Sequence, residues 1–138
     1  MAERFGLVGA RQVGLALRQL SAEVATKIAR RSTNAGAQVI KRRAVANIVA
    51  SPSVDEGDLR DNVIVKRVTE SRLTSEHMVT VRTKKAPHAH LVEFGTVKMP
   101  AEPFLRPAIE GGAQEAARAI VNAIDGGIQR AAKKAARP

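Results

Sequence analysis

The sequence has no cysteine, tryptophan or tyrosine, and phenylalanine occurs only three times in 138 residues. The lack of cysteine excludes disulfide bonds and thiolate metal sites. A core without many aromatic rings must rest on Val, Ile, Leu and Ala, which bury less area each, so we expect a lone subunit to be only modestly stable. Oligomerisation would then supply part of the stability. The shortage of aromatic rings also argues against modules that stack on single-stranded bases.

Long apolar runs are missing as well. No stretch approaches the roughly 18 residues needed to span a bilayer, and the N-terminus lacks the pattern of a signal peptide. We therefore expect no membrane partner and synthesis in the cytoplasm.

Catalytic motifs are equally absent: the sequence has no nucleophile elbow, Walker motif or metalloprotease helix. The best case for an enzyme is a metal site built from His88, His90 and an acid of residues 55–61. No third ligand is evident near the two histidines. We therefore expect no enzymatic activity, no metal and no cofactor.

Positive charge is what the sequence has in excess, with a formal net charge of +10. The excess lies in residues 1–50 and 111–138, whereas residues 51–110 are balanced. A basic excess attracts nucleic acid without regard to sequence, but it also suits acidic partner proteins or a solvated surface. The candidate DNA-facing residues are Lys27, Arg30, Arg31, Lys41, Arg42, Arg43, Lys133 and Lys134.

Apolar residues spaced by three or four predict a long N-terminal helix. Ser21 is a candidate N-cap for a new helix within this segment, residues 51–53 should end the helix, and Asn34 and Gly36 are points where it should bend or break. One apolar stripe comprises Val13, Leu17, Leu20, Val24 and Ile28, and a second stripe continues through Ala35, Val39, Ile40, Ala44 and Ile48.

The same spacing predicts a closing helix, with Pro107 in its first turn and Gly126-Gly127 ending or interrupting it. Its stripe comprises Ile109, Ala113, Ala116, Ala117, Ile120 and Ile124.

Between the helices, residues 59–68, 77–83 and 88–94 have strand character, and three prolines make residues 95–107 a loop. We expect an α+β fold with a long N-terminal helix and a small antiparallel sheet of three to four strands. The Pro-rich loop then leads to a C-terminal helix packed on the sheet. Residues 1–138 form a single domain, of which 128–138 is predicted to be a flexible basic tail.

The most distinctive segment is Glu93-Phe94-Gly95-Thr96, followed by Pro103-Phe104-Leu105-Arg106-Pro107-Ala108. Together with Gly57-Asp58-Leu59-Arg60-Asp61, it resembles the Hong Kong 97-type gene-product-ten family of tailed-phage proteins, which are tail-completion or neck components. The chain departs from the family at His88 or His90, where an aromatic residue is common, and at Glu56, where Thr is common.

The resemblance implies a structural virion protein at the head–tail junction, acting in tail completion, as a tail terminator or in the neck. It implies assembly in the host bacterial cytoplasm into a ring around the DNA path, a hexamer or alternatively a dodecamer. The implied partners are copies of itself, other neck, connector and tail-tube proteins, and genomic DNA. The alternative function is a small basic nucleic-acid-binding module.

The resemblance also implies that the motif takes part in subunit contact, and residue chemistry gives its parts more specific roles. Gly95 permits a positive φ where the chain turns. Glu93 should accept loop N–H groups or pair with Arg106. Phe94 and Phe104 either fill the core or anchor a subunit contact. The predicted interface residues are Glu93, Phe94, Gly95, Thr96, Pro103, Phe104, Leu105, Arg106 and Pro107.

Overall fold

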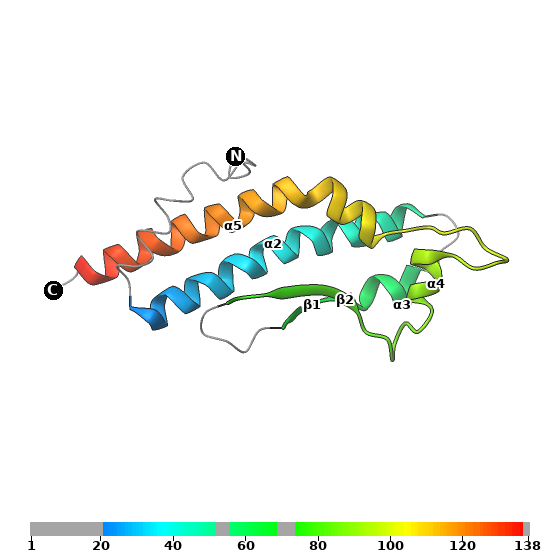
Figure 1. Ribbon diagram of the computed structural model, residues 1–138, viewed down its shortest axis with the longest axis horizontal. Coiled ribbons are helices and arrows are strands. Elements are labelled where there is room, and N and C mark those ends of the chain that lie inside the picture. The colour runs from blue at the N-terminus through cyan, green and yellow to red at the C-terminus, as the bar shows by residue number, and fades with distance from the viewer. Residues whose placement is uncertain (1–20, 52–55, 69–73, 137–138) are drawn as a thin grey trace.

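The computed structural model describes residues 21–51, 56–68 and 74–136. The long helix α2 forms the central layer, with helix α5 along one side and a β-hairpin along the other (Figure 1). Two short helices, α3 and α4, lie at one end of this arrangement. The predicted α+β class is confirmed. The elements in chain order are α2 (Ala22–Ala50), α3 (Glu56–Asp61), β1 (Val63–Arg67), β2 (His77–Val81), α4 (Ala89–Phe94) and α5 (Leu105–Ala136).

Helix α2 begins after Ser21, which the sequence offers as the cap of a new helix, and it ends at Ala50 as predicted. The predicted helical positions Val13, Leu17 and Leu20 lie outside the described residues. The Ser21 hydroxyl accepts the Val24 N–H at 3.3 Å, and Ser51 follows the last helical residue. The expected break at Asn34 and Gly36 is wrong, because the helix continues through both residues. Gly36 is buried against α5, where an added Cβ would lie 2.7 Å from the Ile120 side chain. The glycine therefore lets the two helices approach closely.

Helix α5 also runs through its glycines. Gly126-Gly127 was expected to end or interrupt it, yet it continues to Ala136. Gly127 is buried, and a Cβ there would meet the Ile28 side chain at 3.0 Å. A helical glycine costs about 1 kcal/mol relative to alanine, which the packing of two long helices outweighs. The helix packs mainly along α2, so the expectation that it packs on the sheet is wrong.

The predicted apolar stripe of α5 is only partly at the helix interface. Ile109 is 54 % exposed and Ala113 is also exposed, whereas Ala108, Gly112 and Gly127 are buried. Small residues set the buried side because they allow close contact with α2. The aliphatic spacing alone does not show this.

The sheet of the described region has two antiparallel strands, paired from Val63 with Val81 to Arg67 with His77. The third expected strand, residues 88–94, is instead helix α4. This short segment contains Ala, Leu and Glu, which favour helix, and Gly95 closes it by donating its N–H to Leu91 O at 2.8 Å. Residues 59–61, also expected in a strand, end helix α3.

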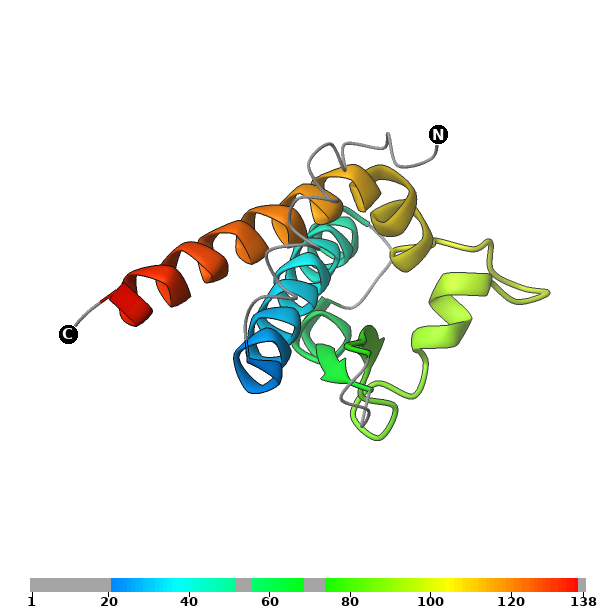
Figure 2. The same cartoon turned by 60° about the vertical axis from the view of Figure 1, so that its left-hand side comes forward.

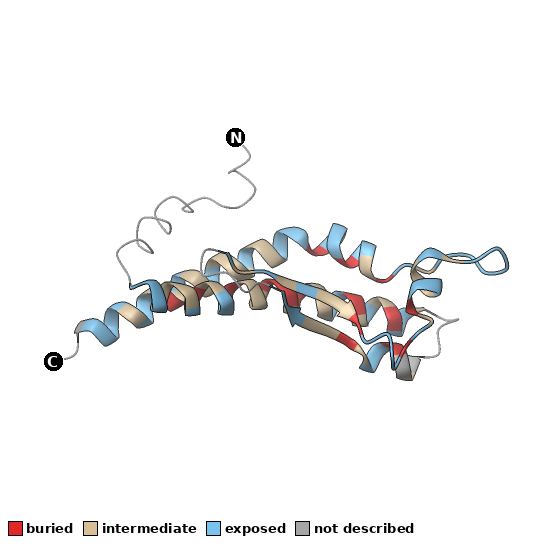
Figure 3. Ribbon diagram, turned by 60° about the horizontal axis from the view of Figure 1, so that its bottom comes forward, coloured by how far each residue is buried: buried red, intermediate tan, exposed pale blue. Residues whose placement is uncertain are grey.

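The main core lies near the end of the molecule where α3, α4 and the start of α5 meet α2 (Figure 3). Phe104 is its largest side chain and is only 2 % exposed. The buried members are Ala44, Ile48, Leu59, Val63, Val81, Ala86, Ala89, Phe104 and Ala108.

Candidate functional site

A single carboxylate organises the segment that carries the sequence motif. Glu93 Oε2 accepts the N–H groups of Phe104 and Leu105 at 2.8 and 3.0 Å, and Oε1 accepts that of Arg106 at 3.0 Å. These donors begin α5 and have no partner within the helix, while the next residue, Pro107, has no N–H. A negative charge is also favourable at a helix N-terminus. The expectation that Glu93 accepts loop N–H groups is therefore confirmed.

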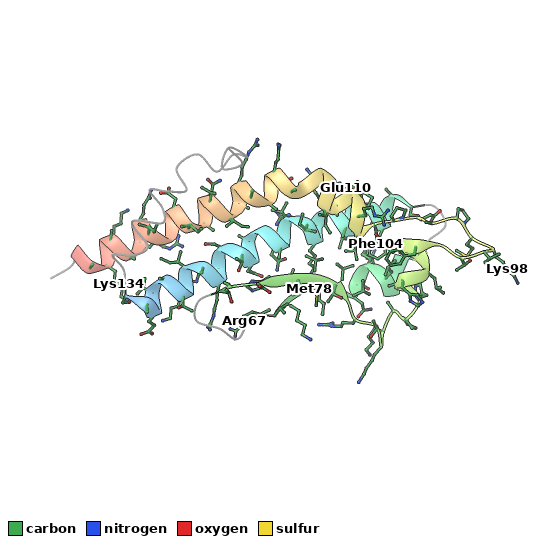
Figure 4. The ribbon with its side chains drawn as sticks, viewed as in Figure 1. Arg67, Met78, Lys98, Phe104, Glu110 and Lys134 are labelled. Carbon is green, nitrogen blue, oxygen red and sulfur yellow. The ribbon has the colours of Figure 1, made fainter. Side chains whose placement is uncertain are left out.

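The loop between α4 and α5 is held by its own backbone. Gly95 has φ of 77°, and a Cβ there would lie 2.7 Å from the Ala101 nitrogen, so the predicted need for glycine is confirmed. Thr96 closes a turn by donating its N–H to Met99 O at 2.9 Å, and its hydroxyl accepts the Met99 N–H at 3.0 Å. The loop tip is thus a defined turn at the extreme end of the molecule, where Lys98 lies (Figure 4).

The return arm of the loop is tied to both neighbouring helices. Glu102 donates its N–H to Val92 O of α4 at 2.9 Å, and its carboxylate accepts the Ser51 hydroxyl at 2.5 Å. Asn47 of α2 donates its side-chain N–H to Phe104 O at 3.0 Å. The protruding turn is therefore braced at its base by α2, α4 and the capped start of α5.

This braced segment exposes several apolar side chains. Phe94 is 70 % exposed, Val97 is fully exposed and Met99 is 51 % exposed. Leu91 and Ile109 are exposed nearby, on α4 and on the first turns of α5. We call residues 89–110 the loop end. Apolar side chains gathered on a structured protrusion are typical of protein interaction sites.

A groove of about 490 Å³ lies beside the same residues. It is lined on its apolar side chiefly by Val81, Phe94, Phe104, Leu105 and Ile109. Phe104 belongs to the core beneath it, whereas the Phe94 side chain is largely exposed. The two phenylalanines, which the sequence could not separate, therefore have different environments.

The comparisons with known proteins bear on what this surface is for. One family pattern matches residues 11–95, more than half of the chain, and its description reads "Bacteriophage HK97-gp10, putative tail-component". The chain belongs to the HK97-gp10-like family of phage tail components. No curated protein and no solved structure matches it. The matched residues of this HK97-gp10-like chain end at Gly95, within the loop end, and the Glu93 carboxylate links them to the start of α5.

The candidate DNA-facing residues of this HK97-gp10-like protein do not share one surface. Lys27, Arg31 and Lys134 line a groove at the end opposite the loop end. Arg43 instead pairs with Glu115 of α5, at 2.8 and 3.1 Å. Of the remaining four, Arg30, Arg42 and Lys133 are exposed and Lys41 is half-buried.

The sequence reasoning missed part of the loop end. Leu91, Val97, Met99 and Ile109 were not among the predicted interface residues, although all are exposed. A usable signal was present, because Val97 and Met99 are apolar residues in a segment whose prolines exclude regular structure. Predicted members Thr96, Pro103, Arg106 and Pro107 are also exposed, and Pro107 lies in the first turn of α5 as expected.

The histidines occupy different surroundings from those expected. His88 precedes α4 and His90 lies within it, so the two do not alternate along a strand. Within residues 21–51, 56–68 and 74–136, no three His, Asp or Glu side chains are grouped to hold a metal. His77 Nδ1 lies 2.7 Å from the Thr33 hydroxyl, and burial followed by the Arg67 charge lowers its pKa.

No helix in the described part of the chain has the length and apolarity to cross a membrane.

Proposed function

We propose that this tail component acts at the head–tail junction as one subunit of a closed ring around the DNA path, with a structural and non-enzymatic role. The role is in tail completion, as a terminator of the tail or in the neck, and a hexamer is the expected ring. The protein would assemble in the host cytoplasm and remain in the virion. Its partners there are copies of itself and neighbouring neck, connector and tail-tube proteins.

The proposal rests on the exposed apolar surface of the loop end. Its exposed apolar side chains stand on a turn whose base is fixed by the Glu93 cap and by contacts to α2. A preorganised surface loses little conformational entropy on docking, which favours association. The surface lies at one end of an elongated subunit (Figure 1), and a ring requires that it meet a different surface of the next copy and not its own counterpart. Such heterologous contacts close into rings when the rotation per subunit divides a full turn.

The direct test is the mass of the assembled protein. We expect native mass spectrometry of the full chain, alone and with its connector and tail-tube partners, to give a ring of fixed subunit number. Phe94→Ser with Val97→Ser should reduce it to monomer while leaving the circular dichroism spectrum unchanged. Met78→Ser is the matched control, because Met78 is 45 % exposed on the hairpin, outside the loop end. A ring that persists in the double variant, or a wild-type chain that stays monomeric with its partners, contradicts the proposal.

The net charge of +10 favours a second candidate, a small nucleic-acid-binding module. It requires that the free protein bind duplex DNA with an affinity that falls steeply with salt, at a log–log slope set by the phosphates contacted. Arg30→Glu with Lys133→Glu should then reduce that slope. Weak binding with a shallow slope excludes this candidate.

A further inference from the structure

A second groove lies at the other end of the molecule, where α2 begins and α5 ends. The two helices diverge there (Figure 2), and the space between them has a volume of about 630 Å³. Its floor is apolar, with Val24 and Ile28 on α2 facing a row of small residues on α5. That row comprises Ala123, Gly127, Ala131 and Ala135.

Four cations surround this apolar floor. Lys27 and Arg31 come from α2, and Arg130 and Lys134 come from α5, so both walls carry positive charge. Lys27 has a single exposed ion pair, with Glu23 at 3.4 Å. Arg31, Arg130 and Lys134 have no ion pair with any residue that the structure describes. The groove therefore combines an apolar base with a rim whose charge is largely uncompensated.

We propose that this groove binds an acidic amphipathic helix of a partner protein. The apolar face of such a helix would cover the floor, and carboxylates along its edges would meet the four rim cations, as in other helix-in-groove complexes. The row of residues 123–135 on α5 extends for about 18 Å, which matches a helix of about three turns. The site is separate from the loop end and does not depend on ring formation.

The charge of the groove decides between possible occupants. Residues 1–20 of this chain contain Arg4, Arg11 and Arg18 but only one acid, Glu3, so they would place positive charge against the four cations. DNA would satisfy the cations through its phosphates, but it would leave the apolar floor without a partner. An acidic amphipathic helix satisfies both parts of the groove.

The test uses the full chain and a synthetic helix-forming peptide of 14 residues, with leucines at helical spacing and glutamates beside them. We expect fluorescence anisotropy to detect its binding. A peptide with the glutamates replaced by lysines, and a scrambled peptide of the same composition, should each bind at least tenfold more weakly. Together these peptides separate the contribution of charge from that of the apolar stripe.

Rim variants place the binding in this groove. Arg31→Glu with Arg130→Glu should weaken binding of the acidic peptide at least tenfold. Lys84→Glu with Lys85→Glu, which changes charge equally in an exposed turn elsewhere, should change it less than twofold. All four side chains are exposed, so we expect unchanged melting curves. If the rim variant does not fold, Lys134→Glu alone should weaken binding of the acidic peptide about threefold, which is half of the tenfold effect on a logarithmic scale.

Several results would overturn the proposal. Equal binding of the scrambled peptide would mean that charge alone acts, and absence of binding would leave the groove without this ligand class. Displacement of the peptide by a 20-base-pair duplex that depends on the same rim cations would assign the groove to DNA. A nitroxide attached through Ala131→Cys that broadens the amide signals of residues 1–20 in the free protein would assign it to the chain itself.

Discussion

Replacing Glu93 tests how one side chain holds the loop end in place. Loss of a single N-cap acceptor costs about 1–2 kcal/mol, and loss of a negative charge at a helix N-terminus costs up to about 1 kcal/mol more. Glu93 is half-buried, so in a variant without this carboxylate water can hydrogen-bond to some of the backbone N–H groups that it leaves. We expect Glu93→Ala to lower the free energy of unfolding by about 2–3 kcal/mol. Glu93→Gln, which keeps one acceptor oxygen, should lower it by about 1–2 kcal/mol.

Urea unfolding with linear extrapolation measures these differences. The matched control is Glu110→Gln, an exposed carboxylate further along the same helix, which should change stability by less than about 0.5 kcal/mol. Amide hydrogen exchange gives a local readout, and the N–H groups of Phe104, Leu105 and Arg106 should exchange faster in the Glu93 variants. Equal effects of Glu93→Gln and Glu110→Gln, with unchanged exchange at those three amides, would refute the capping role.

Three further changes test the rest of the fold. Phe104→Ala should cost about 3–5 kcal/mol in urea unfolding because it empties the core, whereas Phe94→Ala should change stability by less than about 0.5 kcal/mol. Gly95→Ala should lower the melting temperature, because Gly95 has a φ of 77° and an added Cβ would clash with the backbone. Gly57→Ala is the control, since an added Cβ there has free space and should not lower the melting temperature. Equal effects of the two variants would contradict this reasoning. Because the pKa of His77 is lowered in the folded protein, the unfolded chain binds a proton first as the pH falls. The free energy of unfolding should therefore be unaffected by His77 above about pH 6.5 and should decline below it. His77→Gln should make that decline shallower in urea titrations between pH 7.5 and 5, and an unchanged slope would contradict it.

Features set by local chemistry were predictable from the sequence. Ser21 and Ser51 mark the limits of α2, and β-branched residues place β1 and β2. The carboxylate of Glu93 was correctly expected to accept loop N–H groups. In each case the deciding interaction is between residues close in sequence or is made by a side chain that has few possible hydrogen-bond partners.

Features set by contacts between distant residues were not predictable in this way. Residues 88–94 form a segment of only seven residues that mixes apolar and polar side chains, and a segment that short fits a strand or a helix equally well. Gly36 and Gly127 read as helix breakers until the opposite helix is placed against them. The environments of Phe94 and Phe104 also differ only through tertiary packing, since both have the same side chain and lie in the same motif.

The central claim, that the loop end forms the contact between copies, is tested most directly by thiol reactivity. The chain has no cysteine, so Val97→Cys and Lys84→Cys each introduce a single thiol at an exposed site. A maleimide should react with the two thiols at similar rates in the monomer. In the assembled ring, we expect the Val97→Cys thiol to react at least tenfold more slowly and the Lys84→Cys thiol to react as before. An unchanged rate at Val97→Cys in the ring would contradict the account.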